Sequence, residues 1–154
     1  MELLKDFRDF IHLLNLQEVE YLVVGGYALA FHGKPRHTGD LDIWINISEI
    51  NAAKMVNVLD EFGAASLGLS KADFLKEGYV SQIGYPPLRI DILNSIDGVS
   101  FPVAYRNKQT LKLEELEITY IGLDDLITNK KATGRSQDLT DVKQLANLPK
   151  KKPS

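Results

Sequence analysis

Residues 21–45, YLVVGGYALAFHGKPRHTGDLDIWI, decide the fold and the candidate site. An apolar strand runs into a Gly25-Gly26 turn, a short helix and a basic-polar loop, and a second strand then carries Asp40 and Asp42. Residues i and i+2 of a strand face the same side, so these two carboxylates lie roughly 6–7 Å apart along the chain. Asp is disfavoured inside strands, and a buried charged pair costs several kcal/mol unless a cation compensates it. A hard divalent ion with oxygen ligands, Mg²⁺ first, is the simplest compensation.

The composition describes one domain with an ordinary core. The chain has 154 residues, 44% hydrophobic and 25% charged, and a net charge of −3 that argues against a protein built to coat nucleic acid. The absence of cysteine fits the cytoplasm. No apolar run approaches the ~18 residues of a membrane span, and the acidic, amphipathic N-terminus does not resemble a signal peptide. We therefore expect a cytoplasmic protein.

Charge is unevenly distributed along the chain. From residue 126 onward seven Lys and Arg residues face only two Asp residues. Three of these, Lys150 to Lys152, are expected in a basic, flexible tail over 149–154, which leaves residues 1–148 as the folded domain. The other basic residues lie on predicted helices.

Hydrophobic periodicity and turn residues predict the elements around this stretch. Ser48 is a plausible cap of the helix that begins there, with Ile50, Met55, Leu59 and Phe62 as its apolar stripe. Ser70 and Asp73 form a weak capping-box signal. Helices are expected over about 2–16, 27–32, 48–62, 70–78, 123–133 and 136–148, and strands over 21–24, 41–46, 79–85, 89–93 and 117–121. Residues 97–112 are expected to be loop with at most a short extended piece. This order predicts an α+β (mixed α/β) domain with a small mixed sheet, helices packed on one side and a C-terminal helix pair.

A third acid, Asp91, interrupts the apolar strand RIDIL over residues 89–93. A lone strand Asp also occurs at a sheet edge, at a turn, or paired with a nearby Arg, here Arg89 or Arg36. A double glycine after a strand can likewise be an ordinary turn, although its N–H groups are able to approach a phosphate closely. Three such acids on adjacent strands beside this turn can hold two metal ions ~3.5–4 Å apart.

The string GGYALAFHGKPRHTGDLDIWI resembles the signature of the polymerase-beta-type nucleotidyltransferase superfamily. With Gly25, Gly26, Ala28, Arg36, Thr38, Asp40 and Asp42 it is similar to the bacterial stand-alone and abortive-infection or toxin-type members. The resemblance continues in DDLITNKKATGRSQDLTDVKQL, where Lys130, Arg135, Asp138 and Asp141 match. One departure is Gly26, which stands where the superfamily has serine and offers no hydroxyl to a phosphate.

The resemblance implies a nucleotidyltransferase-like fold and a role for each matching residue. Asp40 and Asp42 would bind both metals, Mg²⁺ or Mn²⁺, and Asp91 would complete one metal site and accept the substrate hydroxyl proton. The NTP would be held by Gly25 and Gly26, with Lys130 neutralising the triphosphate. Arg36 and Thr38 would contact phosphate or brace the loop, Arg135 would join Lys130 at the nucleotide, and Asp138 and Asp141 would be structural.

Three hypotheses follow. The first is a metal-dependent enzyme that moves an NMP from an NTP to a hydroxyl of RNA (tRNA among them), a protein or a small molecule, with release of pyrophosphate. The second is a catalytically weak NTP-binding or partner-binding half of a two-component, toxin–antitoxin-like system, with a small helical protein as partner. The third, a scaffold without ligand, leaves three strand acids unexplained. The sequence names neither the acceptor, the nucleotide nor the oligomeric state.

Overall fold

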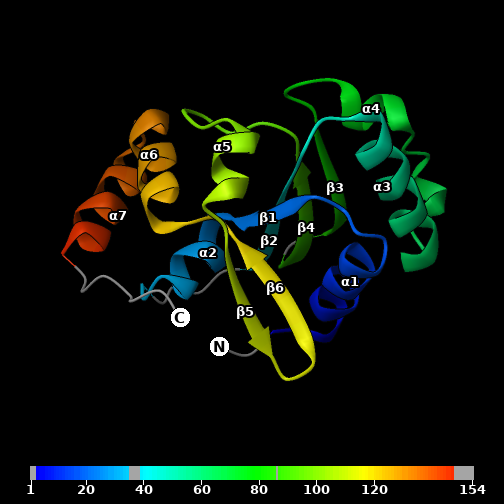
Figure 1. The fold of residues 1–154 in the computed structure, drawn as a ribbon, viewed down its shortest axis with the longest axis horizontal. Coiled ribbons are helices and arrows are strands. Elements are labelled where there is room, and N and C mark those ends of the chain that lie inside the picture. Colours follow the sequence, from blue (N-terminus) through cyan, green and yellow to red (C-terminus); the bar gives the residue numbers. More distant parts are fainter. Residues whose placement is uncertain (1–2, 35–38, 86, 148–154) are drawn as a thin grey trace.

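The computed structural model describes residues 3–34, 39–85 and 87–147, and shows a mixed sheet flanked by helices (Figure 1). The predicted tail over 149–154 lies outside the described residues. The strands are β1 (Tyr21–Val24), β2 (Asp40–Ile45), β3 (Val80–Tyr85), β4 (Leu88–Leu93), β5 (Gln109–Leu113) and β6 (Leu116–Tyr120). The helices are α1 (Lys5–Leu16), α2 (Gly25–Phe31), α3 (Glu49–Phe62), the short 3₁₀ helix η1 (Ala65–Leu67), α4 (Lys71–Leu75), α5 (Phe101–Arg106), α6 (Leu123–Thr133) and α7 (Ser136–Ala146).

The six strands lie in the order β3-β4-β2-β1-β6-β5. The central pair β1–β2 is antiparallel, whereas β2–β4 and β1–β6 are parallel. The hairpins β3–β4 and β5–β6 are antiparallel and end the sheet on either side. The predicted mixed α/β class is confirmed, and the C-terminal pair of helices is present as α6 and α7.

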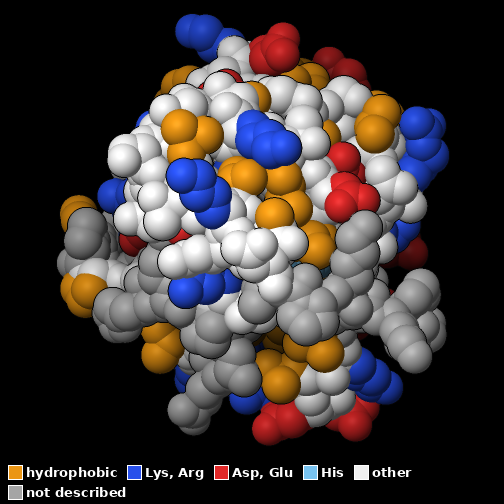
Figure 2. All heavy atoms as spheres, turned by 90° about the vertical axis from the view of Figure 1, so that its left-hand side faces the viewer, with side chains coloured by type: hydrophobic (Ala, Val, Ile, Leu, Met, Phe, Trp, Pro, Cys, Tyr) orange, Lys and Arg blue, Asp and Glu red, His pale blue; other side chains and the backbone are white. Residues whose placement is uncertain are grey.

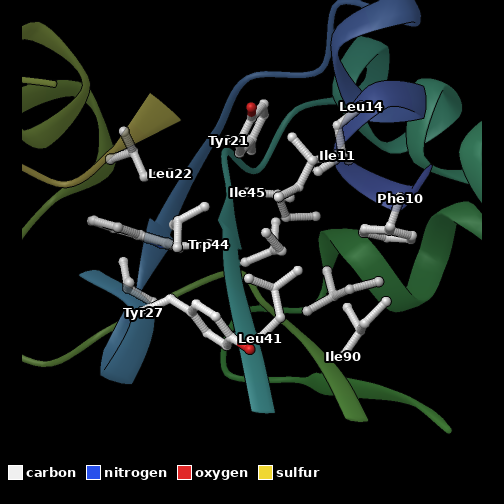
Figure 3. Close-up of a cluster of buried hydrophobic side chains, with 14 of the residues drawn as sticks. Phe10, Ile11, Leu14, Tyr21, Leu22, Tyr27, Leu41, Trp44, Ile45 and Ile90 are labelled. Atoms are coloured by element: carbon white, nitrogen blue, oxygen red, sulfur yellow. The ribbon is translucent and has the colours of Figure 1, made fainter. Parts of the chain in front are cut away.

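The core is built on β2, whose side chains alternate between the two faces of the sheet. Ile45 lies on the face that packs against Ile11 and Leu14 of α1, and Trp44 points to the opposite face (Figure 3). On the first face α1 also meets α3, where Phe10 and Phe62 are in edge contact at 5.1 Å between ring centroids.

The helices therefore occupy both faces of the sheet. The expectation that the helices pack on one side of the sheet holds for the long helices α1 and α3. It does not hold for α5, which covers the other face through the contact of Phe101 with Trp44, at 5.0 Å between ring centroids. Trp44 is buried in the core. In the described residues no helix has the length and apolar character needed to cross a membrane.

The capping predictions are confirmed. The Ser48 hydroxyl accepts a hydrogen bond from the Asn51 backbone N–H at 3.0 Å, and Ser70 and Asp73 form a capping box at α4. The predicted apolar stripe of α3 is wrong at Ile50, which is 72% exposed. Asn51 is buried instead, because its side chain binds the backbone of Glu20 at the start of β1.

The expectation for 97–112 is wrong at α5, a helix that was not predicted, whereas the start of β5 agrees with the short extended piece. Helix α5 has only six residues, too few for a helical period to be visible in the sequence. It begins at Phe101-Pro102, where proline suits the first turn of a helix, and it is stabilised by burial of Phe101 against Trp44. Strand β5 pairs with β6 along its whole length.

Candidate active site

The acidic residues of the sequence come together through the register of β2 and β4. These strands are parallel, with Asp42 directly beside Asp91 and Asp40 directly beside Arg89. Paired residues of neighbouring strands, and residues i and i+2 of one strand, share a face of the sheet. All four side chains therefore lie on the face that α5 covers further along at Trp44. The predicted placement of Asp40, Asp42 and Asp91 on one side of the sheet is what the structure shows.

Gly25 lies against this acidic face at the junction of β1 and α2. Its φ of +68° is in the left-handed region that favours glycine. A Cβ atom at this position would overlap the Asp42 carboxylate, so no other residue fits without displacing that acid. The helix begins at Gly25 rather than at Tyr27, which makes both glycines part of its first turn. The sequence predicted that the backbone at this turn can approach a phosphate closely. In the structure the group that lies close to the Gly25 backbone is the Asp42 carboxylate.

Arg89 binds two of the three acids. Its Nε donates to Asp91 Oδ1 at 2.7 Å, and its Nη2 donates to Asp91 Oδ2 and Asp40 Oδ2, both at 3.0 Å. Such two-pronged contacts between a guanidinium and a carboxylate are among the stronger hydrogen bonds in proteins. The alternative that the sequence left open for Asp91, pairing with Arg89, is therefore realised in the structure.

Asp42 is the acid to which Arg89 makes none of these hydrogen bonds. Burial raises the pKa of Asp42 to about 7, and repulsion from Asp91 and Asp40 adds to the effect, while the charge of Arg89 opposes it. Among the described residues of the site, one guanidinium therefore faces three carboxylates, and its single charge does not balance theirs.

The carboxylates suit a hard cation in kind but not in their present arrangement. Within the described ranges no three His, Cys, Asp or Glu side chains are placed to hold one metal ion together. The Arg89 guanidinium pairs with both Asp40 and Asp91, so a cation shared by these two acids would compete with it. The predicted set of three metal ligands is therefore present on the sheet without forming a preassembled metal centre.

The structure does not bring Lys130 and Arg135 into this acidic cluster. The Lys130 ammonium is buried between α6 and α7 and binds Asp138 and Asp141, each at 3.1 Å. Arg135 donates from Nε to Asp138 Oδ2 at 2.7 Å, although 75% of its side chain is exposed to solvent. The predicted structural role of Asp138, pairing with Arg135, agrees with these contacts. Lys130 likewise has a structural role, because its hydrogen-bond partners are Asp138 and Asp141 rather than the acids of β2 and β4.

Asp138 is held ionised by its neighbours. Burial by itself would raise its pKa, but hydrogen bonds from Thr133, Arg135 and Lys130 outweigh burial and lower it to about 2. Two further predicted site residues, Arg36 and Thr38, lie outside the residues that the structure describes.

Arg89 is a site residue whose importance the sequence did not predict. The sequence indicated it only as one of two possible arginine partners for Asp91, beside Arg36. The signal was the spacing of RID over 89–91, because an Arg two residues before an Asp on a strand must share its face. Gly39 is a second residue that went unnoticed: a Cβ atom there would overlap the backbone carbonyl of Pro87, so glycine allows β2 and β4 to start side by side.

The fold and the acidic face define a nucleotidyltransferase-like domain. Residues 2–148 match the family described as nucleotidyltransferases of unknown function (DUF6036), and the chain belongs to that family. No curated protein matches the chain.

Two solved structures share the fold. A proposed nucleotidyltransferase from Thermotoga maritima has a TM-score of 0.59 at 14% identity, over 92% of this chain and 90% of that one. An antigenic nucleotidyltransferase-like protein from Paracoccidioides brasiliensis has a TM-score of 0.54 at 15% identity, over 90% of this chain and 71% of that one. The resemblance to nucleotidyltransferases that the motifs indicated is confirmed by family and fold.

Proposed function

We propose that this protein transfers a nucleoside monophosphate from an NTP to a hydroxyl acceptor. The observation that carries the proposal is the register of Asp42 beside Asp91, with Gly25 packed against the Asp42 carboxylate. Carboxylates on two adjacent strands next to a glycine turn suit a reaction at a phosphate, in which positioning and charge stabilisation supply most of the catalysis.

In the proposed reaction the acceptor oxygen attacks the α-phosphorus and forms the new O–P bond. The bond between the α-phosphorus and the bridging oxygen to the β-phosphate breaks, and pyrophosphate leaves. The proton of the hydroxyl passes to a carboxylate, for which Asp91 is the candidate. The first turn of α2, at Gly25 and Gly26, is the candidate for holding the triphosphate. A divalent cation would neutralise phosphate charge, but the pairing of Arg89 with Asp40 and Asp91 leaves no preassembled place for it.

The acceptor is proposed as a class, a hydroxyl of RNA, protein or a small molecule. On the side of the molecule formed by α6 and α7, single Lys and Arg side chains are separated by hydrophobic and uncharged ones (Figure 2). Among the residues that the structure describes, this surface shows no continuous basic track for a nucleic-acid backbone. An acceptor assay should therefore include proteins and small molecules beside RNA.

The decisive experiment incubates the protein with each α-labelled NTP, Mg²⁺ or Mn²⁺, and total cellular RNA, protein and metabolites. Transfer of α-label with none from γ-labelled NTP supports the proposal, because it identifies the NMP as the group moved. Asp42→Asn should abolish transfer, while Asp60→Asn, an exposed acid on α3, should retain it. Label transfer that survives Asp42→Asn would place the reaction elsewhere in the chain.

The second candidate, a catalytically weak NTP-binding module of a two-component system, is favoured by one observation. Arg89 already pairs with Asp40 and Asp91, so a catalytic cation would have to compete with it for these two acids. NTP binding without transfer to any acceptor would favour this candidate. Its proposed partner is a small helical protein, to be sought by co-purification.

A further inference from the structure

Arg89 contacts two of the three acids in the candidate site, the ones that a shared cation would bind. Its guanidinium contacts both oxygens of Asp91 and one oxygen of Asp40, with all three distances between 2.7 and 3.0 Å. The contacts come from both β4 and β2, so the guanidinium ties the two strands together across their parallel seam. Any cation that is to share Asp40 and Asp91 meets a positive charge already in place.

The backbone of Arg89 is fixed whereas its side chain has room to leave. The N–H of Arg89 donates to the carbonyl oxygen of Gly39 at 3.3 Å, which secures the start of β4. The side chain is 24% exposed, so part of it already meets solvent. Its guanidinium is the end of a long side chain whose charge is weakly hydrated, and it can turn outward without disturbing the core.

We propose that Arg89 is a built-in competitor of the divalent cation, which binds to Asp40 and Asp91 only when the guanidinium swings out of the acidic cluster. The proposal rests on the proposed function, because it assigns a regulation to the same site. Arg89 is in this view a positioning residue. It holds the carboxylates together in the resting protein and sets the cation concentration at which the site becomes occupied.

The proposal predicts that removing the guanidinium strengthens cation binding. In Arg89→Gln the three carboxylates lose their internal positive charge, and Asp91 is buried without its partner. Mn²⁺ should then bind at least about tenfold more tightly than to the unmodified protein, the factor that corresponds to losing one charge-assisted competitor. Arg89→Lys should lie between the two, because an ammonium cannot fork across both carboxylates.

The measurement is a titration of Mn²⁺ alone, with no nucleotide or acceptor, followed by the electron paramagnetic resonance of the free ion. The matched control is Arg8→Gln, which removes another arginine–carboxylate pair, Arg8 with Glu114, located on α1 and the β5–β6 turn. Its Mn²⁺ affinity should equal that of the unmodified protein. An Arg89→Gln affinity that equals or falls below the control would overturn the proposal, because Arg89 would then be neutral or supportive for the cation.

A second measurement uses the unmodified chain and does not depend on how a variant folds. The Arg89 Nε–H hydrogen bond to Asp91 gives a side-chain ¹⁵N signal that Arg89→Lys identifies by its absence. Addition of Mg²⁺ should move this signal toward that of a solvated arginine. Saturation of the carboxylates by Mg²⁺ with an unchanged Nε signal would mean that cation and guanidinium coexist. Neither readout involves the transfer reaction, so competition can fail while NMP transfer stands, and the reverse.

Discussion

The Asp42 carboxylate occupies the space that a side chain on Gly25 would need. We therefore expect Gly25→Ala to destabilise the protein for two reasons. The left-handed backbone costs an alanine about 1–2 kcal/mol, and overlap with Asp42 adds about 1–3 kcal/mol. Urea unfolding measures the sum, and NTP binding should be weakened because Asp42 is displaced.

Gly134 provides the matched control for this change. It has the same φ of +68°, at the end of α6, and nothing lies within 4 Å of where its Cβ would be. Gly134→Ala should show the backbone cost alone. Equal losses of stability in the two variants would mean that the contact with Asp42 imposes no constraint.

Asp42→Asn should separate ligand binding from the stability of the free protein. With Mg²⁺ and NTP at about 100 times the dissociation constant, the unmodified chain should gain about 2.7 kcal/mol, or about 5–10 °C in Tm. The variant should lose most of this gain, yet its ligand-free Tm should be equal or higher, because one of three crowded carboxylates becomes neutral. Thermal unfolding with and without ligand measures both, with Asp60→Asn as control. A full ligand shift in Asp42→Asn would mean that the nucleotide binds at another site.

Lys130→Met should cost stability, because it leaves Asp138 and Asp141 buried without their shared cation. Removing one partner of a buried ion pair typically costs about 3–5 kcal/mol. Lys131→Met, at the exposed neighbouring position, should cost little. Urea unfolding measures the difference. If the folded Lys130 variant also binds NTP more weakly by about 1.5–3 kcal/mol, the role at the triphosphate implied by the family resemblance holds in addition.

Acid should weaken the α6–α7 contact through Asp138. Its folded pKa of about 2 lies below the ordinary value of 3.8, so its stabilising contribution is complete above about pH 5 and is lost as the pH falls toward 2. The contribution amounts to at most about 2.5 kcal/mol. Urea unfolding between pH 2 and 5 should show a shallower pH dependence for Asp138→Asn than for the unmodified chain. Parallel curves would show that Asp138 does not stabilise the fold through its charge.

The acidic strands were predictable because carboxylates inside apolar strands are conspicuous. Asp40 and Asp42 stand out among Leu41, Ile43 and Trp44, and Asp91 stands out within RIDIL. Strand order is a different matter, because pairing of β2 with β4 joins residues 49 positions apart, as in the contact of Arg89 with Asp40. Local sequence carries no signal for such a pairing, so the position of Arg89 between the acids became visible only in three dimensions.

The residues on α6 and α7 show a second limit of sequence reasoning. The family resemblance implies that Lys130 and Arg135 meet the triphosphate, whereas a helix Lys with an Arg five residues later is also typical of a solvated helix face. Which of these applies depends on how the helices face each other. Gly134, in the left-handed conformation, turns the chain so that α7 presents Asp138 and Asp141 to Lys130.

The acidic pair, Asp42 and Asp91, lies on two parallel strands, β2 and β4. Its geometry does not depend on the length of the chain segment that joins these strands. A parallel pair requires a crossover, and here the crossover contains α3, η1, α4 and β3. Residues inserted between α3 and α4 would lengthen the crossover without changing the register of Asp42 beside Asp91. The length of the crossover is therefore a poor guide to whether the acidic pair is intact.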